Sequence, residues 1–116
     1  GAEGQVQGGV VMGIGQALTE GSTYDANGHQ RNPALLEYKL QTAADAPPID
    51  IHFVQINTPN AGPRGAKGLA EAPNVATAAA ISNALAKLIG APVRQLPMTA
   101  ERVWKTQQGT DAGVAP

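Results

Sequence analysis

Glycines interrupt the first helix-like stretch of the chain, and they constrain its fold more than any other feature. Between residues 6 and 18 the apolar side chains recur at the spacing of one helical face, which predicts an amphipathic helix. The same stretch contains Gly8, Gly9, Gly13 and Gly15. Each interior glycine costs a helix about 1 kcal/mol relative to alanine, so together they oppose it by about 3 to 4 kcal/mol. We therefore expect another backbone or a ligand to lie against the glycine face, where a Cβ would clash.

The middle of the chain predicts short strands, and with them an α+β fold. Asn27-Gly28 is a strong signal for a two-residue hairpin turn, with strands expected near residues 22 to 26 and 29 to 33. The segment "IDIHFVQI" is rich in β-branched and apolar residues, which predicts a strand over residues 49 to 56. Helices mixed with an antiparallel hairpin indicate a single α+β unit of 116 residues.

Two further helices are expected after the long irregular loop "NTPNAGPRGAKG". Pro73 suits the first turn of a helix over residues 72 to 89, which glycine and proline then end. Its predicted buried stripe is Ala78, Ile81, Leu85 and Leu88. Thr99 can cap a last helix that runs to about Gln107. Residues 108 to 116 are expected to be a disordered tail.

Composition excludes several classes of function. A formal net charge of −1 gives no attraction to nucleic acid or to an anionic membrane, so neither is an expected partner. The chain has no cysteine, which removes disulfides, iron–sulfur ligation and thiolate zinc sites and fits a cytoplasmic location. His29 and His52 lie far apart, so we expect no metal held by protein side chains. The sequence starts without methionine, which suggests a processed chain, an engineered piece or a fragment.

Five segments then occur in a familiar order: "GQVQGGVVMGIGQALTE", "YDANG", "EYKLQTAADAPPI", "GAKGLAEAP" and "LPMTAERV". In this order they resemble the C-terminal part of the molybdopterin-binding subunit of the xanthine dehydrogenase and aldehyde oxidase family, the molybdenum hydroxylases. The resemblance covers residues 4 to 103. It implies that residues 1 to 107 are the C-terminal portion of a larger cofactor-binding domain, containing two main helices, a hairpin and short strands.

The resemblance assigns roles to three residues. In the family a glutamate of the "KG-x-GE" segment acts as the base that activates the attacking oxygen, and Glu71 occupies that place in "KGLAE". Gln5 is similar to a glutamine that donates hydrogen bonds to the cofactor, and Gly68 belongs to the same cofactor-binding segment as Glu71. Ala70 departs from the family pattern, because a glycine normally precedes the glutamate. If that position needed a positive φ, the methyl group would cost about 1 kcal/mol or more.

The residues alone leave these roles open. A helix start favours a carboxylate by about 0.3 to 1 kcal/mol, whereas burial in an apolar cleft opposes its ionisation. Glu71 could equally be one of the many glutamates that decorate helix starts, and Gln5 a solvated residue beside a helix. Lys67 has the same alternative as a solvent-facing loop lysine.

By resemblance, the chain is expected to be a fragment or subunit of a molybdenum hydroxylase, inactive alone. The parent enzyme would hydroxylate an aldehyde or an N-heteroaromatic carbon oxidatively, with water as oxygen donor. The implied cofactor is molybdopterin, with or without a cytosine nucleotide, and iron–sulfur and FAD centres would lie only on other domains or chains. Expected partners are the remainder of the molybdenum subunit, those electron-transfer subunits and a small-molecule substrate. The alternatives are a homo-oligomer or a non-catalytic binding or interaction module, whose glycine face packs against a partner chain.

Overall fold

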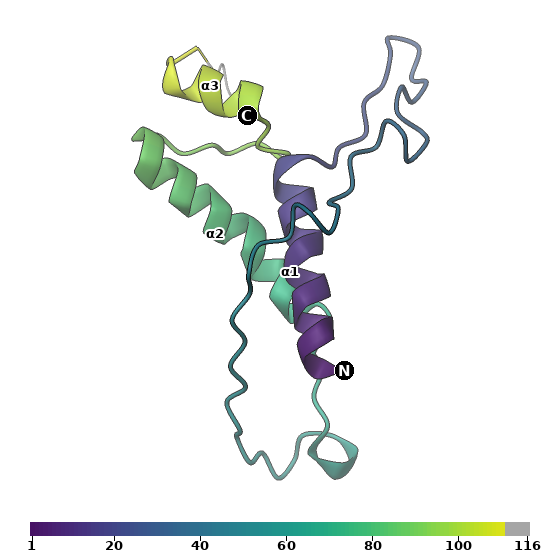
Figure 1. Ribbon diagram of the computed structural model, residues 1–116, viewed down its shortest axis with the longest axis vertical. Helices are drawn as coiled ribbons and strands as arrows, with labels where there is room; N and C mark the ends of the chain where they lie inside the picture. Colours follow the sequence, from purple (N-terminus) through teal and green to yellow (C-terminus); the bar gives the residue numbers. More distant parts are fainter. Residues whose placement is uncertain (111–116) are drawn as a thin grey trace.

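The computed structural model describes residues 1–110, and these residues form three helices joined by long loops (Figure 1). Helix α1 spans Ala2–Leu18, the 3-10 turn η1 spans Pro63–Gly65, α2 spans Ala72–Ile89 and α3 spans Ala100–Gln107. Helix α2 crosses α1, and α3 lies near the C-terminal end of α1. No helix in this part of the chain is long and apolar enough to cross a membrane.

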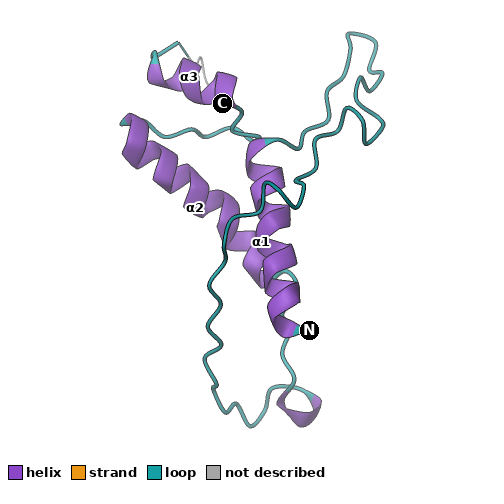
Figure 2. Ribbon diagram, in the orientation of Figure 1, coloured by secondary structure: helices purple, strands orange, loops and turns teal. Residues whose placement is uncertain are grey.

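The predicted α+β class is wrong, because residues 1–110 contain no β-strand (Figure 2). The hairpin turn does form at Gly28, with φ 83°, but its arms are reduced to one antiparallel bridge between Tyr24 and Gln30. Residues 49–56 have no neighbouring strand. A strand exists only where a second one pairs with it, and an isolated two-stranded hairpin is marginal in water.

The helix predictions are largely confirmed. Helix α2 has the predicted bounds and ends at Gly90 in the left-handed region, with φ 76°. Thr99 caps α3 by accepting a hydrogen bond from the Arg102 amide at 3.3 Å. Helix α1 begins at Ala2 rather than at residue 6. Of the predicted buried stripe, Ala78, Ile81 and Leu85 are partly buried against the core. Leu88 is the error, because it is 81% exposed. The tail prediction falls mostly on residues 111–116, which lie outside the described residues.

The glycines of α1 let α2 approach its backbone, as their number predicts. A Cβ built on Gly13 would lie 2.6 Å from Thr77 Cβ, and one built on Gly9 would lie 3.1 Å from Pro73 Cβ. Gly9 and Gly13 are four residues apart on α1, and Pro73 and Thr77 are four residues apart on α2. The two pairs therefore form one continuous helix–helix contact. Gly8 has no atom within 4 Å of such a Cβ and lies beside this contact rather than in it.

The hydrophobic core is small for the length of the chain. Ala17, Val93 and Met98 are the fully buried apolar side chains among residues 1–110. The Met98 amide donates a hydrogen bond to the Ala17 carbonyl at 2.6 Å, which joins these two core residues. Ser82 Oγ donates a hydrogen bond to the Val93 carbonyl at 3.0 Å, which ties Val93 to α2. The radius of gyration is 17.7 Å, against about 13 Å for a compact domain of about 100 residues.

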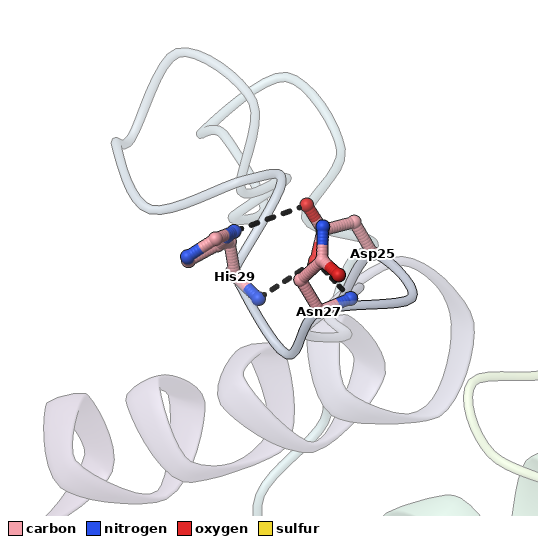
Figure 3. A network of polar contacts seen from close by, with 3 residues as sticks. All are labelled: Asp25, Asn27 and His29. Carbon is pink, nitrogen blue, oxygen red and sulfur yellow. Dashed lines mark hydrogen bonds and ion pairs between the residues drawn. The ribbon is translucent and has the colours of Figure 1, made fainter.

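Asp25 organises the exposed loop that follows α1 (Figure 3). One carboxylate oxygen accepts from the Asn27 amide at 2.8 Å and the His29 amide at 2.9 Å, and the other lies 3.2 Å from His29 Nδ1. Donation by the His29 amide is the main reason that the pKa of Asp25 lies below its usual value of 3.8. This turn is therefore built around an ionised carboxylate.

We expect this turn to loosen in acid. Because the folded pKa of Asp25 is lowered, its contribution is present above the unfolded value of 3.8 and is lost as pH falls through the folded pKa. The amide NMR signals of Asn27 and His29 should titrate over that range. Asp25→Asn should abolish their titration, and Glu37→Gln should not. Amide shifts that stay constant from pH 6 to pH 2 would contradict this account of the turn.

We expect Gly13→Ala to destabilise the protein that contains this chain by about 1 to 3 kcal/mol, because its methyl group must displace Thr77. Urea unfolding measures the change. The matched control is Gly8→Ala, where the space is open and the helix gains up to about 1 kcal/mol from alanine. Equal effects of the two substitutions would mean that the glycines do not serve this contact.

Candidate functional site

A cavity of about 270 Å³ lies where the N-terminal half of α1 meets the start of α2. It brings together two of the three predicted site residues, Gln5 and Glu71, from distant parts of the sequence. Its lining consists of Gly4, Gln5, Gly8, Gly9, Met12, Ala70, Glu71 and Asn74. Gln5, Met12 and Glu71 are exposed, so the cavity is open at its rim.

Helix α1 supplies one wall of this cavity through a single face. The lining positions 4, 5, 8, 9 and 12 are separated by three or four residues, which places them together on a helix. A Cβ on Gly4 or Gly8 would meet nothing within 4 Å, so both positions leave room for a ligand group against the backbone. Gly9 instead faces the Ala70 carbonyl and fixes the distance between the two walls.

The backbone of Glu71 starts helix α2, and its side chain makes no capping bond. Its carbonyl accepts from the Asn74 amide at 3.1 Å and from the Val75 amide at 3.2 Å, which starts the helix. Its carboxylate makes no capping bond and no ion pair with any of residues 1–110. The positive end of the α2 dipole favours a negative charge at this position. The side chain is therefore an anionic acceptor without a partner in this part of the protein.

Asn74 is the site residue that sequence reasoning missed. Its Nδ2 donates only to Met12 Sδ, at 3.8 Å, and a thioether is a weak acceptor. Its Oδ1 is buried without a hydrogen-bond partner among the described residues. A buried acceptor of this kind costs about 1 to 3 kcal/mol if it stays unpaired. The available signal was an amide side chain one helical turn after Glu71, at the start of the same helix.

The structure does not bring Gly68 into this cavity. Its φ is not positive, and a Cβ there would meet nothing within 4 Å, so no conformational reason for glycine is visible. Its assignment to cofactor binding stays a prediction. Ala70 also lacks a positive φ, so its methyl group causes no backbone strain. Lys67 is exposed and lines a separate groove.

A larger groove of about 790 Å³ lies near the other end of α1 and contains none of the predicted site residues. Its two cationic side chains are already engaged. Arg102 Nη1 donates to the Pro97 carbonyl at 2.7 Å, and Lys105 Nζ lies 2.6 Å from Glu101 Oε1. Within residues 1–110 no cluster of three or more His, Cys, Asp or Glu side chains could hold a metal ion.

Known proteins resemble this chain over most of its length. A family model described as the molybdopterin cofactor-binding domain matches residues 1–47, which include the whole of α1. The xanthine dehydrogenase molybdenum-binding subunit of Escherichia coli O157:H7 is 46% identical over 105 residues, covering 90% of this chain and 14% of that subunit. The chain belongs to the molybdenum hydroxylase large-subunit family. The resemblance seen in the sequence is thus confirmed, while the C-terminal location and the 1–107 boundary stay predictions.

Two further relatives match the chain over a similar length. The nicotine 6-hydroxylase large subunit of Paenarthrobacter nicotinovorans is 34% identical, over 92% of this chain and 13% of that subunit. The crystal structure of quinoline 2-oxidoreductase from Pseudomonas putida 86 matches 91% of this chain and 14% of its own, with 31% identity and a TM-score of 0.82. The chain therefore spans about 14% of the length of such relatives.

Proposed function

We propose that this chain forms one wall of the cofactor site of a molybdenum hydroxylase, in which Glu71 is the catalytic base and Gln5 binds the cofactor. The observation that carries the proposal is that Gln5 and Glu71 line one cavity on the two crossing helices. The reaction is oxidative hydroxylation of an aldehyde or an N-heteroaromatic carbon, in which a C–H bond and water give C–OH, two protons and two electrons.

The lining of the cavity suits an organic cofactor that brings its own metal ligands. The Gln5 amide can donate a hydrogen bond, and Gly4 and Gly8 admit a flat ring close to the backbone. The lining contains no thiolate or imidazole side chain, and a dithiolene makes such a metal ligand unnecessary. When bound, molybdopterin supplies the redox-active molybdenum that accepts the two electrons of the substrate.

The size and openness of the cavity indicate that this chain holds only part of that cofactor. Sites for small molecules usually enclose about 300 to 1,000 Å³ and cover most of the ligand surface. This cavity is smaller, at about 270 Å³, and three of its side chains are exposed. The other walls must come from the remainder of the molybdenum subunit, so the chain is inactive alone.

Glu71 has the geometry that a general base requires. A base must accept a proton through a free oxygen, and this carboxylate is not occupied by a cap or an ion pair among residues 1–110. The first turn of α2 holds the Glu71 backbone at the rim of the cavity through its carbonyl. Its function is to take the proton from the oxygen nucleophile as the carbon–oxygen bond forms. The released electrons leave through iron–sulfur and FAD centres on other domains or chains.

One observation favours a second candidate, a non-catalytic interaction module. Large apolar side chains such as Leu36, Val54 and Leu88 are each 81% exposed, which indicates surfaces that other protein covers. Metal analysis of the purified complete protein separates the two functions. About one molybdenum per chain supports the hydroxylase, and none supports the interaction module.

Replacing Glu71 by glutamine should lower turnover by at least about 10²-fold in the complete enzyme, the usual scale of a lost general base. Molybdenum content should not change, because glutamine has the same size and the carboxylate is not a metal ligand in the proposal. The matched control is Glu3→Gln, an exposed residue of α1 outside the cavity, and it should leave turnover unchanged. Near-normal turnover of the Glu71 variant would remove this residue from the chemistry.

Replacing Gln5 by glutamate should lower cofactor affinity by about 10-fold or more, because a hydrogen-bond donor becomes a charged acceptor. Molybdenum and pterin released from the denatured protein measure the loss after dialysis against a cofactor-free buffer. Gln7→Glu makes the same chemical change on the same helix, outside the cavity, and should retain the cofactor. Equal retention in both variants would place the cofactor away from Gln5.

A further inference from the structure

Residues 49–57 were predicted to include a strand, but in the structure they form a segment without a pairing partner. It follows Pro47 and Pro48 and runs away from the helices before the chain returns through η1 to α2 (Figures 1 and 2). No backbone N–H or C=O group of this segment makes a hydrogen bond with any of residues 1–110. Both of its edges are therefore free to pair.

The composition of the segment is that of a strand in a sheet. The sequence "IDIHFVQI" contains three isoleucines, a valine and a phenylalanine among its eight residues, types that favour paired strands. Yet Phe53 is 50% exposed, Val54 81% and Ile56 67%. An unpaired extended segment with exposed apolar side chains is a template for a second strand, whose main chain supplies the hydrogen bonds.

We propose that residues 49–57 add as a β-strand to a sheet edge of the remaining part of the molybdenum-binding subunit. The inference rests on the proposed function, because that function requires a larger subunit around the cavity. Matched relatives are far longer, since the chain covers 14% of them, so ample polypeptide exists to supply the sheet. The segment contains one acidic and no lysine or arginine side chain, which favours an uncharged sheet edge over a charged partner.

The position of the segment connects it to the candidate site. A groove of about 510 Å³ lies between its end, Val54 to Asn57, and the loop residues Gly65 and Lys67. That loop leads directly to Glu71. Pairing of the segment would therefore hold one end of the loop, and the polypeptide that completes the cavity would also fix the approach to its base. A second copy of this chain would pair the strand without completing the cavity.

Hydrogen exchange in the complete, cofactor-loaded subunit tests the inference. We expect amides within residues 49–57 to exchange at least about 10²-fold more slowly than an unstructured peptide of the same sequence, because paired amides are protected. Val54→Pro removes one backbone donor and should abolish the protection, while Val54→Thr keeps the donor and should retain it. If Val54→Pro fails to fold, exchange in the unaltered subunit decides the question by itself.

The outcomes separate this inference from the proposed function. Free exchange of residues 49–57 in a sample that retains molybdenum and turnover would overturn strand addition and leave the hydroxylase intact. Protection in a sample that binds no molybdenum would support strand addition and contradict the hydroxylase. Protection that disappears on dilution of a dimer would show that a second copy is the partner, and the inference would then be wrong.

Discussion

The close contact between α1 and α2 is the interaction on which the candidate site depends. Gly13 lies against Thr77 and Gly9 against Pro73 without an intervening Cβ, so the two helix backbones approach more closely than ordinary side chains allow. The wall that carries Gln5 and the helix start that carries Glu71 meet for this reason. Glycine is a poor helix former, so the residues that permit this close contact also lower the intrinsic stability of α1. Where α2 does not contact the glycines, as at Gly8, the same absence of side chains leaves room for a ligand.

The sequence predicted those features that depend on neighbouring residues in the chain, and it failed for features that depend on distant residues. Caps and stop signals are local, and they located α2, the Thr99 cap and the Gly90 end correctly. Strand pairing is not local, and the segment at 49–56 has the right residues but no second strand among residues 1–110. Leu88 fails for the same reason, since periodicity gives a helix an apolar stripe without saying how much of it the chain itself can cover.

The residues of the candidate site also differ in how far the sequence could predict them. The motif resemblance predicted roles for Gln5 and Glu71, and both line one cavity where α1 meets the start of α2. Asn74 could not be predicted with equal force, because its significance lies in a buried oxygen without a donor, which is a property of packing. Gly68 was predicted from the motif, but neither its φ nor the space around it requires a glycine.

The start of α2 explains how a carboxylate can be kept free at a helix end. A helix N-terminus has unsatisfied amides that a side chain commonly caps, and a capping glutamate would be unavailable as a base. Here Pro73 occupies the first turn and has no amide to satisfy, and the Glu71 carbonyl accepts from the Asn74 and Val75 amides. The helix thus begins without using the carboxylate. A proline placed two residues after the glutamate thereby favours both the start of the helix and the availability of its side chain for chemistry.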